Sequence, residues 1–368
     1  MKRPAMKKTL RQRLDGEYER LKKLETTFLG YPSDAEFDYS PIYRFLDFPI
    51  NNVGDPFESS TYRMQTKEFE REVLGFFARL LHIEDYWGYI TNGGTEGNLY
   101  GLYAAREHFP KAPVFFSEHA HYSMRKNAHV LGLKTVVVKS RPSGEIDYGD
   151  FEAKVRGVRE AIVVANIGTT MMGAIDKVPR LSRILDRHKV RSYIHADAAL
   201  YGMVLPFVSD VRFDFRTKIN SIAISGHKFI GSPIPCGVML ARRAAVERLR
   251  TYIEYIDAHD STLSGSRDAF TPLVFWYRIH TMGMRGFKKQ VLYSVGLADF
   301  LVRELKKIGW PDVRQSYITV AFKRPSDRIV NKWELAAKGD VAHVICLPHE
   351  SKAELRAFVG ELAADRKG

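Results

Sequence analysis

The sequence predicts an α/β protein with a mainly parallel sheet covered by helices on both faces, followed by a small α+β domain. From about residue 86, short apolar runs alternate with longer amphipathic runs, which is typical of strand–helix–strand units. From about residue 287 the pattern changes to one long helical run, two strand-like runs and a last helical run. We therefore expect a helical N-terminal segment at 1–45, a large domain at 46–285 and a small domain at 286–368.

The apolar runs of the large domain are short and nearly continuous, as in strands that are buried on both faces. Strands are expected at 86–90, 114–116, 135–138, 161–165, 192–196, 221–225 and 237–241. Helices are expected at 10–23, 95–109 and 122–132 and, in the small domain, at 288–308 and 352–364, beside strands at 317–322 and 342–347. Ligands gather outside the carboxyl ends of strands in such sheets, so the residues after each strand are the candidates for a functional site.

The composition fits a globular protein and argues against several other classes. Hydrophobic residues make up 45% of the chain, and no run approaches the ~18 apolar residues of a membrane helix. Cys236 and Cys346 stand far apart without a C-x-x-C motif, so we expect no disulfide framework, no metal site and a cytoplasmic location. The basic N-terminus lacks the apolar block of a secretory signal. The early acidic residues Asp15, Glu17 and Glu19 disfavour a mitochondrial transit peptide, which stays open as an alternative.

The formal net charge of +13 would suit a nucleic-acid-binding protein. Lys and Arg are scattered along the chain, often beside Asp or Glu, rather than gathered in blocks with interleaved aromatic residues. We therefore attribute the excess to solvated surface and expect neither a nucleic-acid nor a membrane partner. A basic nucleic-acid-binding protein stays open as an alternative from another class.

Two ionisable residues follow neighbouring apolar strands. Lys228 comes just after the strand at 221–225, where it could simply reach solvent. Burial would instead lower its pKa and make it a competent amine for Schiff-base chemistry. Asp197 directly follows the strand at 192–196, where it could cap a helix. Its alternative role is to hold a cation, such as a protonated ring nitrogen, within ~4–6 Å.

A glycine-rich turn at 91–98 follows the first strand and opens a helix. Small residues let backbone N–H groups close on an anion, and the helix dipole adds a favourable potential. The turn is therefore a candidate phosphate site, although glycine-rich turns are common. It is not G-x-G-x-x-G, and the segment at 168–173 lacks the Lys and Ser/Thr of a P-loop.

Several motifs occur in a fixed order along nearly the whole chain: INNVGDP (50–56), TNGGTEGN (91–98), HYS (121–123), NIGTT (166–170), HADAAL (195–200), SGHKFIGSPIPCG (225–237), YIDAHDSTLSGSR (255–267) and GDVAHV (339–344). Together they resemble the group II decarboxylases that depend on pyridoxal 5′-phosphate (PLP). The resemblance is strongest to the histidine decarboxylase-like branch, which is related to serine decarboxylases. It favours the functional roles of Lys228 and Asp197 over the structural ones.

The resemblance implies a fold-type I, aspartate aminotransferase-like large domain with a seven-stranded sheet, PLP as cofactor, and a homodimer with shared active sites. It implies that Lys228 holds PLP as a Schiff base and that Asp197 pairs with the pyridine nitrogen. His121 is expected to stack on the ring rather than to be a core histidine. The implied cofactor-binding residues are Gly94, Thr95, Glu96, His121, Thr170, Asp197, Ala199, Ser225, His227 and Lys228.

The substrate is the least determined part of the prediction. The resemblance implies an L-amino acid, with L-histidine to histamine as the leading hypothesis and L-serine or another polar or acidic amino acid as the alternative. The segment at 60–65 departs from the patterns of either activity, and an inward-pointing Arg63 would favour an acidic or polar side chain. The candidate substrate contacts are Tyr62, Arg63, Met64, Gln65, Tyr255 and His259. Either of the last two could reprotonate the product carbon.

A PLP-dependent aminotransferase is the alternative reaction on the same fold. Such enzymes usually clamp the substrate α-carboxylate with an arginine of the small domain. Arg314, Lys323 and Arg324 leave that alternative open.

Overall fold

The computed structural model describes residues 8–34 and 37–366 and divides into two compact units. The larger unit comprises Ser33–Gly296 and Leu347–His349. The smaller unit takes the described residues up to Pro32, Leu297–Cys346, and those from Glu350 onward. The domain boundaries expected at residues 45 and 285 stay a prediction.

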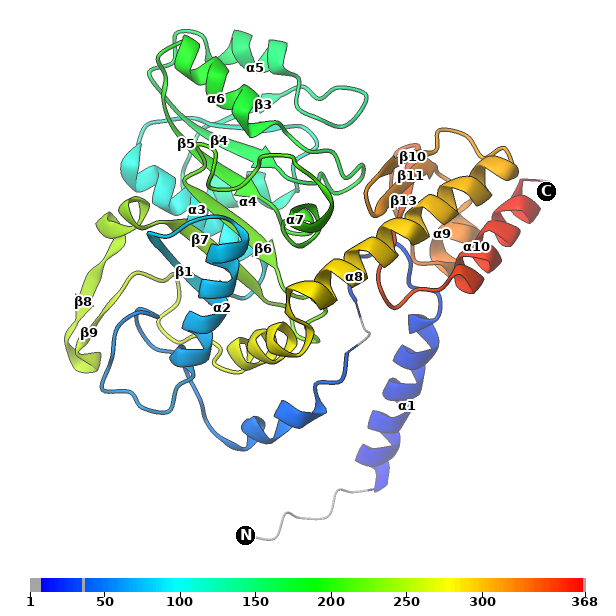
Figure 1. The fold of residues 1–368 in the computed structure, drawn as a ribbon, viewed down its shortest axis with the longest axis horizontal. Coiled ribbons are helices and arrows are strands. Elements are labelled where there is room, and N and C mark those ends of the chain that lie inside the picture. Colours follow the sequence, from blue (N-terminus) through cyan, green and yellow to red (C-terminus); the bar gives the residue numbers. More distant parts are fainter. Residues whose placement is uncertain (1–7, 35–36, 367–368) are drawn as a thin grey trace. The chain divides into compact units, whose positions relative to one another are not determined.

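The larger unit is built around a seven-stranded sheet, in the order β1-β7-β6-β5-β4-β2-β3 (Figure 1). Strand β7 pairs antiparallel with both of its neighbours, and the other pairings are parallel. The predicted mainly parallel, seven-stranded sheet is confirmed. The strands are β1 (Tyr86–Thr91), β2 (Val114–Ser117), β3 (Thr135–Val138), β4 (Glu160–Asn166), β5 (Arg191–Asp197), β6 (Ser221–Ser225) and β7 (Gly237–Arg242).

The central strands are buried on both faces. Every residue of β6 is buried, as is every residue of β4 after Glu160. Because side chains alternate between the two faces of a strand, both faces of the sheet are covered. Helix α3 (Gly94–His108) covers one face, with most of its contacts to β5, β6 and β7.

Local signals explain where two helices of this unit begin. Asp147 caps α5 by accepting from the N–H groups of Gly149 and Asp150, and α6 has a proline in its first turn. The other helices are α2 (Lys67–Leu80), α4 (Ser123–Val130), α5 (Tyr148–Val155), α6 (Val178–Arg187) and α7 (Leu205–Val208). Short 3-10 helices are η1 (Ser40–Asp47), η2 (Tyr201–Met203), η3 (Arg243–Ala245), η4 (Glu247–Leu249) and η5 (Glu254–Ile256).

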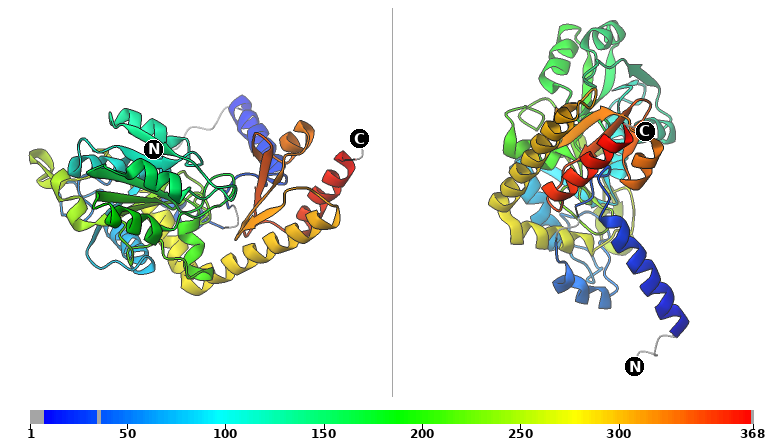
Figure 2. Two further views of the ribbon diagram at one scale, coloured as in Figure 1. Left: turned by 90° about the horizontal axis from the view of Figure 1, so that it is seen from above. Right: turned by 90° about the vertical axis from the view of Figure 1, so that its right-hand side faces the viewer.

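A two-stranded hairpin of β8 (Thr251–Ile253) and β9 (Ala258–Asp260) projects from the edge of the larger unit (Figures 1 and 2). The sequence pattern did not predict it, because three-residue strands are too short for alternation to be recognised. Its tip is exposed, with Tyr255 retaining 80% of its accessible surface.

The smaller unit packs helices against a four-stranded antiparallel sheet, in the order β10-β11-β13-β12 (Figure 2). Its core includes Leu301, Phe322, Val344 and Phe358. The predicted helix at 288–308 is the second part of α8 (Thr271–Lys307), which is interrupted at Gly283, where φ is 57°. The remaining elements are α1 (Lys8–Glu25), β10 (Arg314–Ser316), β11 (Thr319–Lys323), α9 (Asp327–Lys332), β12 (Ala336–Lys338), β13 (Val341–Ile345) and α10 (Lys352–Asp365).

Across residues 8–34 and 37–366, none of the helices has the length and apolarity that a membrane span requires.

Candidate active site

Lys228 and Asp197 lie at the same edge of the sheet because the strands that carry them are parallel neighbours. Asp197 ends β5 and pairs in register with Ala223 of β6. Burial lowers the pKa of Lys228, and the charge of Asp197 partly opposes that shift. Asp197 is 8% exposed and Lys228 is half-buried, so the amine is desolvated but still accessible. The predicted amine and carboxylate are therefore within electrostatic reach of one another.

His121, in the loop after β2, belongs to the same group. Burial lowers its pKa, and the charges of Asp197 and Lys228 act on it in opposite directions. Its Nδ1 lies 2.7 Å from the Ser123 hydroxyl oxygen and accepts from the Ser123 backbone N–H at 3.4 Å. Because a backbone N–H only donates, the neutral ring carries its proton on Nε2. The role of Ser123 in orienting this ring was not predicted, although the residue stands in the HYS motif.

The glycine-rich turn joins this group through three close approaches. A side chain at Gly94 would place its Cβ 2.7 Å from the Ser225 hydroxyl oxygen and 3.5 Å from Ala199 Cβ. A Cβ at Gly93 would lie 3.5 Å from the His227 ring. The turn after β1 therefore adjoins the ends of β5 and β6. Glycine at these two positions keeps the space between the three strand ends open.

Glu96 holds the turn together from within the first turn of α3. One carboxylate oxygen accepts from the Asn92 backbone N–H at 3.0 Å and from its amide nitrogen at 2.6 Å. The other oxygen accepts from the Tyr89 hydroxyl at 2.9 Å. Both oxygens thus bind residues of β1 and the turn, which gives Glu96 a structural task. Direct contact between Glu96 and a cofactor stays a prediction.

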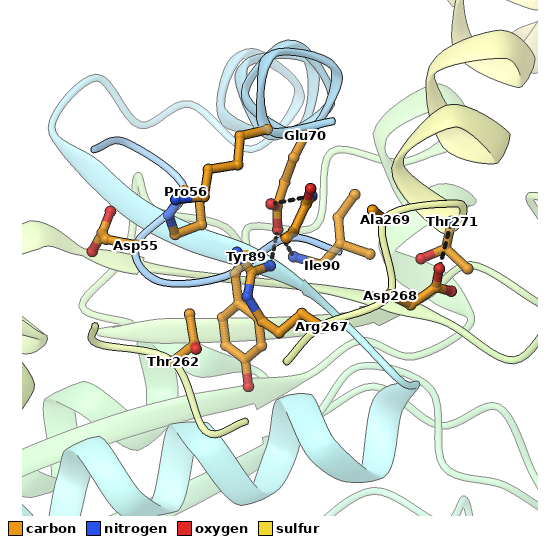
Figure 3. A network of polar contacts seen from close by, with 12 residues as sticks. Asp55, Pro56, Glu70, Tyr89, Ile90, Thr262, Arg267, Asp268, Ala269 and Thr271 are labelled. Atoms are coloured by element: carbon orange, nitrogen blue, oxygen red, sulfur yellow. Dashed lines mark hydrogen bonds and ion pairs between the residues drawn. The ribbon is translucent and has the colours of Figure 1, made fainter. Parts of the chain in front are cut away.

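A buried ion pair supports β1 (Figure 3). Glu70 of α2 accepts from the Ile90 backbone N–H at 2.9 Å and pairs with the Arg267 guanidinium. Arg267 also donates to the Gly54 carbonyl at 3.1 Å and lies 5.6 Å from the centre of the Tyr89 ring. This network joins α2, β1 and the segments around residues 54 and 267. It was not predicted, because Glu70 and Arg267 are 197 positions apart and no local pattern links them.

The two segments predicted to contact substrate lie against each other. The Thr61 N–H donates to the Ile256 carbonyl at 3.0 Å, and Tyr62 packs on a cluster that includes Ile256. The Tyr62 hydroxyl donates to the Pro49 carbonyl, and the His259 ring bonds the Glu58 carboxylate. These hydrogen bonds join the two polar groups to residues other than Lys228.

The other predicted substrate and loop residues are more open to solvent. Gln65 is half-buried. The remaining side chains, Arg63, Met64, Thr170 and Tyr255, are exposed. Substrate contacts by the residues of both segments, and the cofactor contact of Thr170, stay predictions.

A mainly parallel sheet whose carboxyl edge carries a desolvated amine, a buried carboxylate and a glycine-rich helix start has the groups that an α/β enzyme needs to bind a phosphorylated carbonyl compound. Comparison with known families agrees. The pyridoxal-dependent decarboxylase conserved domain matches residues 64–313, so the chain belongs to this family of PLP-dependent carboxy-lyases.

Individual relatives place the chain in the group II, histidine decarboxylase-like branch. Histidine decarboxylase of Pseudomonas entomophila (strain L48) is 42% identical over 365 residues, which cover 96% of this chain and 91% of the relative. Histidine decarboxylase of Morganella morganii is 43% identical, with 92% of each chain covered. The crystal structure of L-methionine decarboxylase from Streptomyces sp. 590, in its internal aldimine form, superposes with a TM-score of 0.88 at 28% identity, over 98% of this chain and 96% of the other.

The residues at the sheet edge fit PLP in charge and in shape. The cradle between Gly94, Ser225 and Ala199 is one that a single added Cβ would begin to fill. The N-cap of α3 is Gly93, which has no side chain to cap the first-turn N–H groups, so these are available to an anion such as phosphate. Lys228 has an amine of lowered pKa that would bond the PLP aldehyde, and Asp197 would supply a negative charge for the ring nitrogen.

We expect Gly93→Ala to weaken PLP binding roughly tenfold while leaving the fold intact. Gly93 has φ 134° and ψ 177°, a conformation that costs other residues about 1–3 kcal/mol, so the variant turn must relax away from its binding shape. Titration of the purified apoprotein with PLP, followed by absorbance, measures the change. Gly296→Ala is the control, because nothing lies within 4 Å of the added Cβ. Equal PLP affinity for the two variants would contradict the expectation.

Proposed function

We propose that the protein decarboxylates L-histidine to histamine and CO₂. The single observation that carries the proposal is the identity of 41–43% to curated histidine decarboxylases over 92–96% of the chain. L-Serine, or another polar or acidic amino acid, is the alternative substrate, because the segment at 60–65 departs from the sequence patterns expected of histidine and serine decarboxylases. The family membership favours decarboxylation over the transamination that the sequence left open.

In this proposal Lys228 is the residue that binds PLP covalently, and Asp197 pairs with the ring nitrogen. Contact with Asp197 would raise the ring nitrogen pKa by about 1–3 units and keep the ring protonated. His121, held in orientation by Ser123, would cover one face of the ring, and Ala199 would lie at the other face. Gly94, Thr95, Ser225 and His227 would hold the phosphate, with Glu96 and Thr170 nearby.

PLP, when bound, supplies an electron sink for the electron pair that CO₂ leaves behind. The protein residues bind and orient the cofactor and the substrate, and they transfer protons. Lys228 has a lowered pKa, so a larger fraction of its amine is unprotonated and able to exchange with the substrate amine. The buried strand ends exclude water from one side of the Asp197 carboxylate, and this strengthens its interaction with a cation. Tyr255 or His259 delivers the proton to the product carbon.

We also propose that the protein acts in the cytoplasm as a homodimer in which the segment around Tyr255 serves the partner's active site. Large apolar side chains at the surface of the larger unit support a dimer. Tyr43 is 52% exposed, Leu46 64% and Phe48 56%, and all three belong to or follow η1. Tyr255 is exposed at the hairpin tip, so it is available to a second subunit.

A panel of L-amino acids assayed for CO₂ release tests the proposed substrate. We expect L-histidine to give the highest kcat/KM, and histamine to appear in a one-to-one ratio with CO₂. L-Serine, L-glutamate and L-methionine serve as competitors in the same assay. Preference for any of these over L-histidine would overturn the substrate assignment, while keto-acid formation without CO₂ would overturn the reaction class.

Substitutions at the amine and the carboxylate test the assigned roles. Lys228→Ala should abolish turnover and the visible band that borohydride removes, while circular dichroism shows a native fold. Asp197→Asn should keep PLP yet turn over roughly a hundredfold more slowly, because the ring loses the charge that stabilises its protonated form. A fully active Asp197→Asn enzyme would refute the role of Asp197.

Subunit complementation tests the shared active site. If Tyr255 is the proton donor and serves the partner's site, the Tyr255→Ala enzyme is inactive. Mixing it with inactive Lys228→Ala subunits then gives a heterodimer with one site that carries both defects and one that carries neither. We expect activity to return to about a quarter of the wild-type value after subunit exchange. Recovery should fail if each site is built from one chain, and sedimentation of the wild type as a monomer would exclude the dimer.

A further inference from the structure

A cluster of three ionisable side chains lies next to the backbone of residues 228–231, which we call the Lys228 turn, within the larger unit. One carboxylate oxygen of Asp34 lies 3.2 Å from the Arg278 guanidinium, and the other lies 3.2 Å from His349 Nδ1. The Asp34 and Arg278 side chains are completely buried, and that of His349 is 16% exposed. Arg278 comes from α8, so the cluster joins three segments that are distant in the sequence.

Asp34 and Arg278 both bind the turn that carries Lys228. The Asp34 backbone N–H donates to the Lys228 carbonyl at 3.3 Å. The Arg278 Nε–H donates to the Ile230 carbonyl at 3.0 Å. The turn itself closes with a 3.0 Å hydrogen bond from the Gly231 N–H to the Lys228 carbonyl. The two partners of the ion pair thus hold two carbonyl groups of this turn, Asp34 through its backbone and Arg278 through its side chain.

The fit between Asp34 and the turn is tight at Gly231. This glycine has φ +75°, and a Cβ on it would lie 3.0 Å from the Asp34 carbonyl oxygen. On the other side of Lys228, the Gly226 N–H donates to the Cys236 carbonyl at 2.7 Å, and His227 Nδ1 lies 3.0 Å from the same carbonyl. The backbone is therefore held by hydrogen bonds on both sides of Lys228, to Cys236 on one side and to the residues of the ion pair on the other.

Stability alone is a weak explanation for the pair. Two buried charges lose their hydration, and well-packed apolar residues of the same size often serve the fold equally well. What apolar residues cannot do is bind the Ile230 carbonyl, or hold the segment whose N–H binds Lys228. Arg278 also lies 4.3 Å from the centre of the Phe37 ring, which restricts its guanidinium further.

We propose that Asp34, Arg278 and His349 are positioning residues that hold the Lys228 amine in place for bonding to the cofactor. The inference rests on the proposed function, since it takes Lys228 as the cofactor lysine. In the step concerned, the unprotonated amine attacks the PLP aldehyde carbon, a C=N bond forms and water leaves. A turn with free backbone torsions would present the amine in many orientations, and the condensation would slow.

The test compares covalent with non-covalent cofactor binding in the double variant Asp34→Asn/Arg278→Met, which removes both charges together. Pyridoxamine 5′-phosphate carries no aldehyde, so its affinity reports the phosphate turn and Asp197 without Lys228. We expect that affinity to stay within twofold of wild type. The rate of PLP condensation, followed by stopped-flow absorbance and trapped with borohydride, should fall at least tenfold.

The matched control is Asp214→Asn/Arg216→Met. Asp214 is also a buried aspartate held by an arginine and a histidine, at 2.7 Å from Arg216 and 3.2 Å from His82. Its contacts involve none of the residues of the Lys228 turn, so both cofactor measurements should stay within twofold of wild type. His349→Asn is a milder variant that keeps the Asp34–Arg278 pair, and we expect it to slow condensation about threefold even if the double variant does not fold.

Condensation at the wild-type rate in both the double variant and His349→Asn would overturn the proposal. A parallel loss of pyridoxamine 5′-phosphate affinity would also overturn it, because the damage would then be general. Failure of the wild-type enzyme to form a borohydride-stable bond at Lys228 would instead refute the proposed function.

Discussion

The parallel pairing of β5 with β6 is the constraint on which the rest of the site depends. It brings Asp197 and Lys228, which are 31 positions apart, to one edge of a sheet that is buried on both faces. Burial lowers the pKa of the amine, and the neighbouring carboxylate limits that shift. An amine in bulk water would stay protonated, and a carboxylate without a nearby cation would be costly to bury. Each group therefore makes the burial of the other tolerable.

Polar side chains other than Lys228 and Asp197 hold the backbone around these two groups. Glu96 fixes the glycine-rich turn, Glu70 and Arg267 fix β1, and the Asp34–Arg278 pair fixes the turn after β6. Buried charges add little net stability, so their common effect is on geometry. In the proposed function, the glycine-rich turn and the turn that carries Lys228 must keep their spacing for one cofactor to reach both.

The residues proposed to bind the cofactor and those proposed to bind the substrate differ in their exposure to solvent. Most of the residues proposed to bind the cofactor are buried or half-buried, and Thr170 is the exposed one among them. The segments around Tyr62 and Tyr255 bond to each other, and Arg63 and Tyr255 face solvent. The proposed second subunit would cover these side chains, so the proposed substrate contacts would depend on the dimer more than the proposed cofactor contacts do.

The sequence by itself determined the fold class, the strand order along the chain and the family, because each rests on local patterns. Apolar runs located the strands at 135–138 and 221–225 with the bounds that the structure has, and placed Lys228 and Asp197 after strand ends. Only the tertiary structure decided that Ser123 orients His121, that Arg267 pairs with Glu70, and that Arg278 supports the Lys228 turn. The last two depend on contacts across 197 and 48 positions, and such long-range pairing leaves no trace in the spacing of residues along one chain.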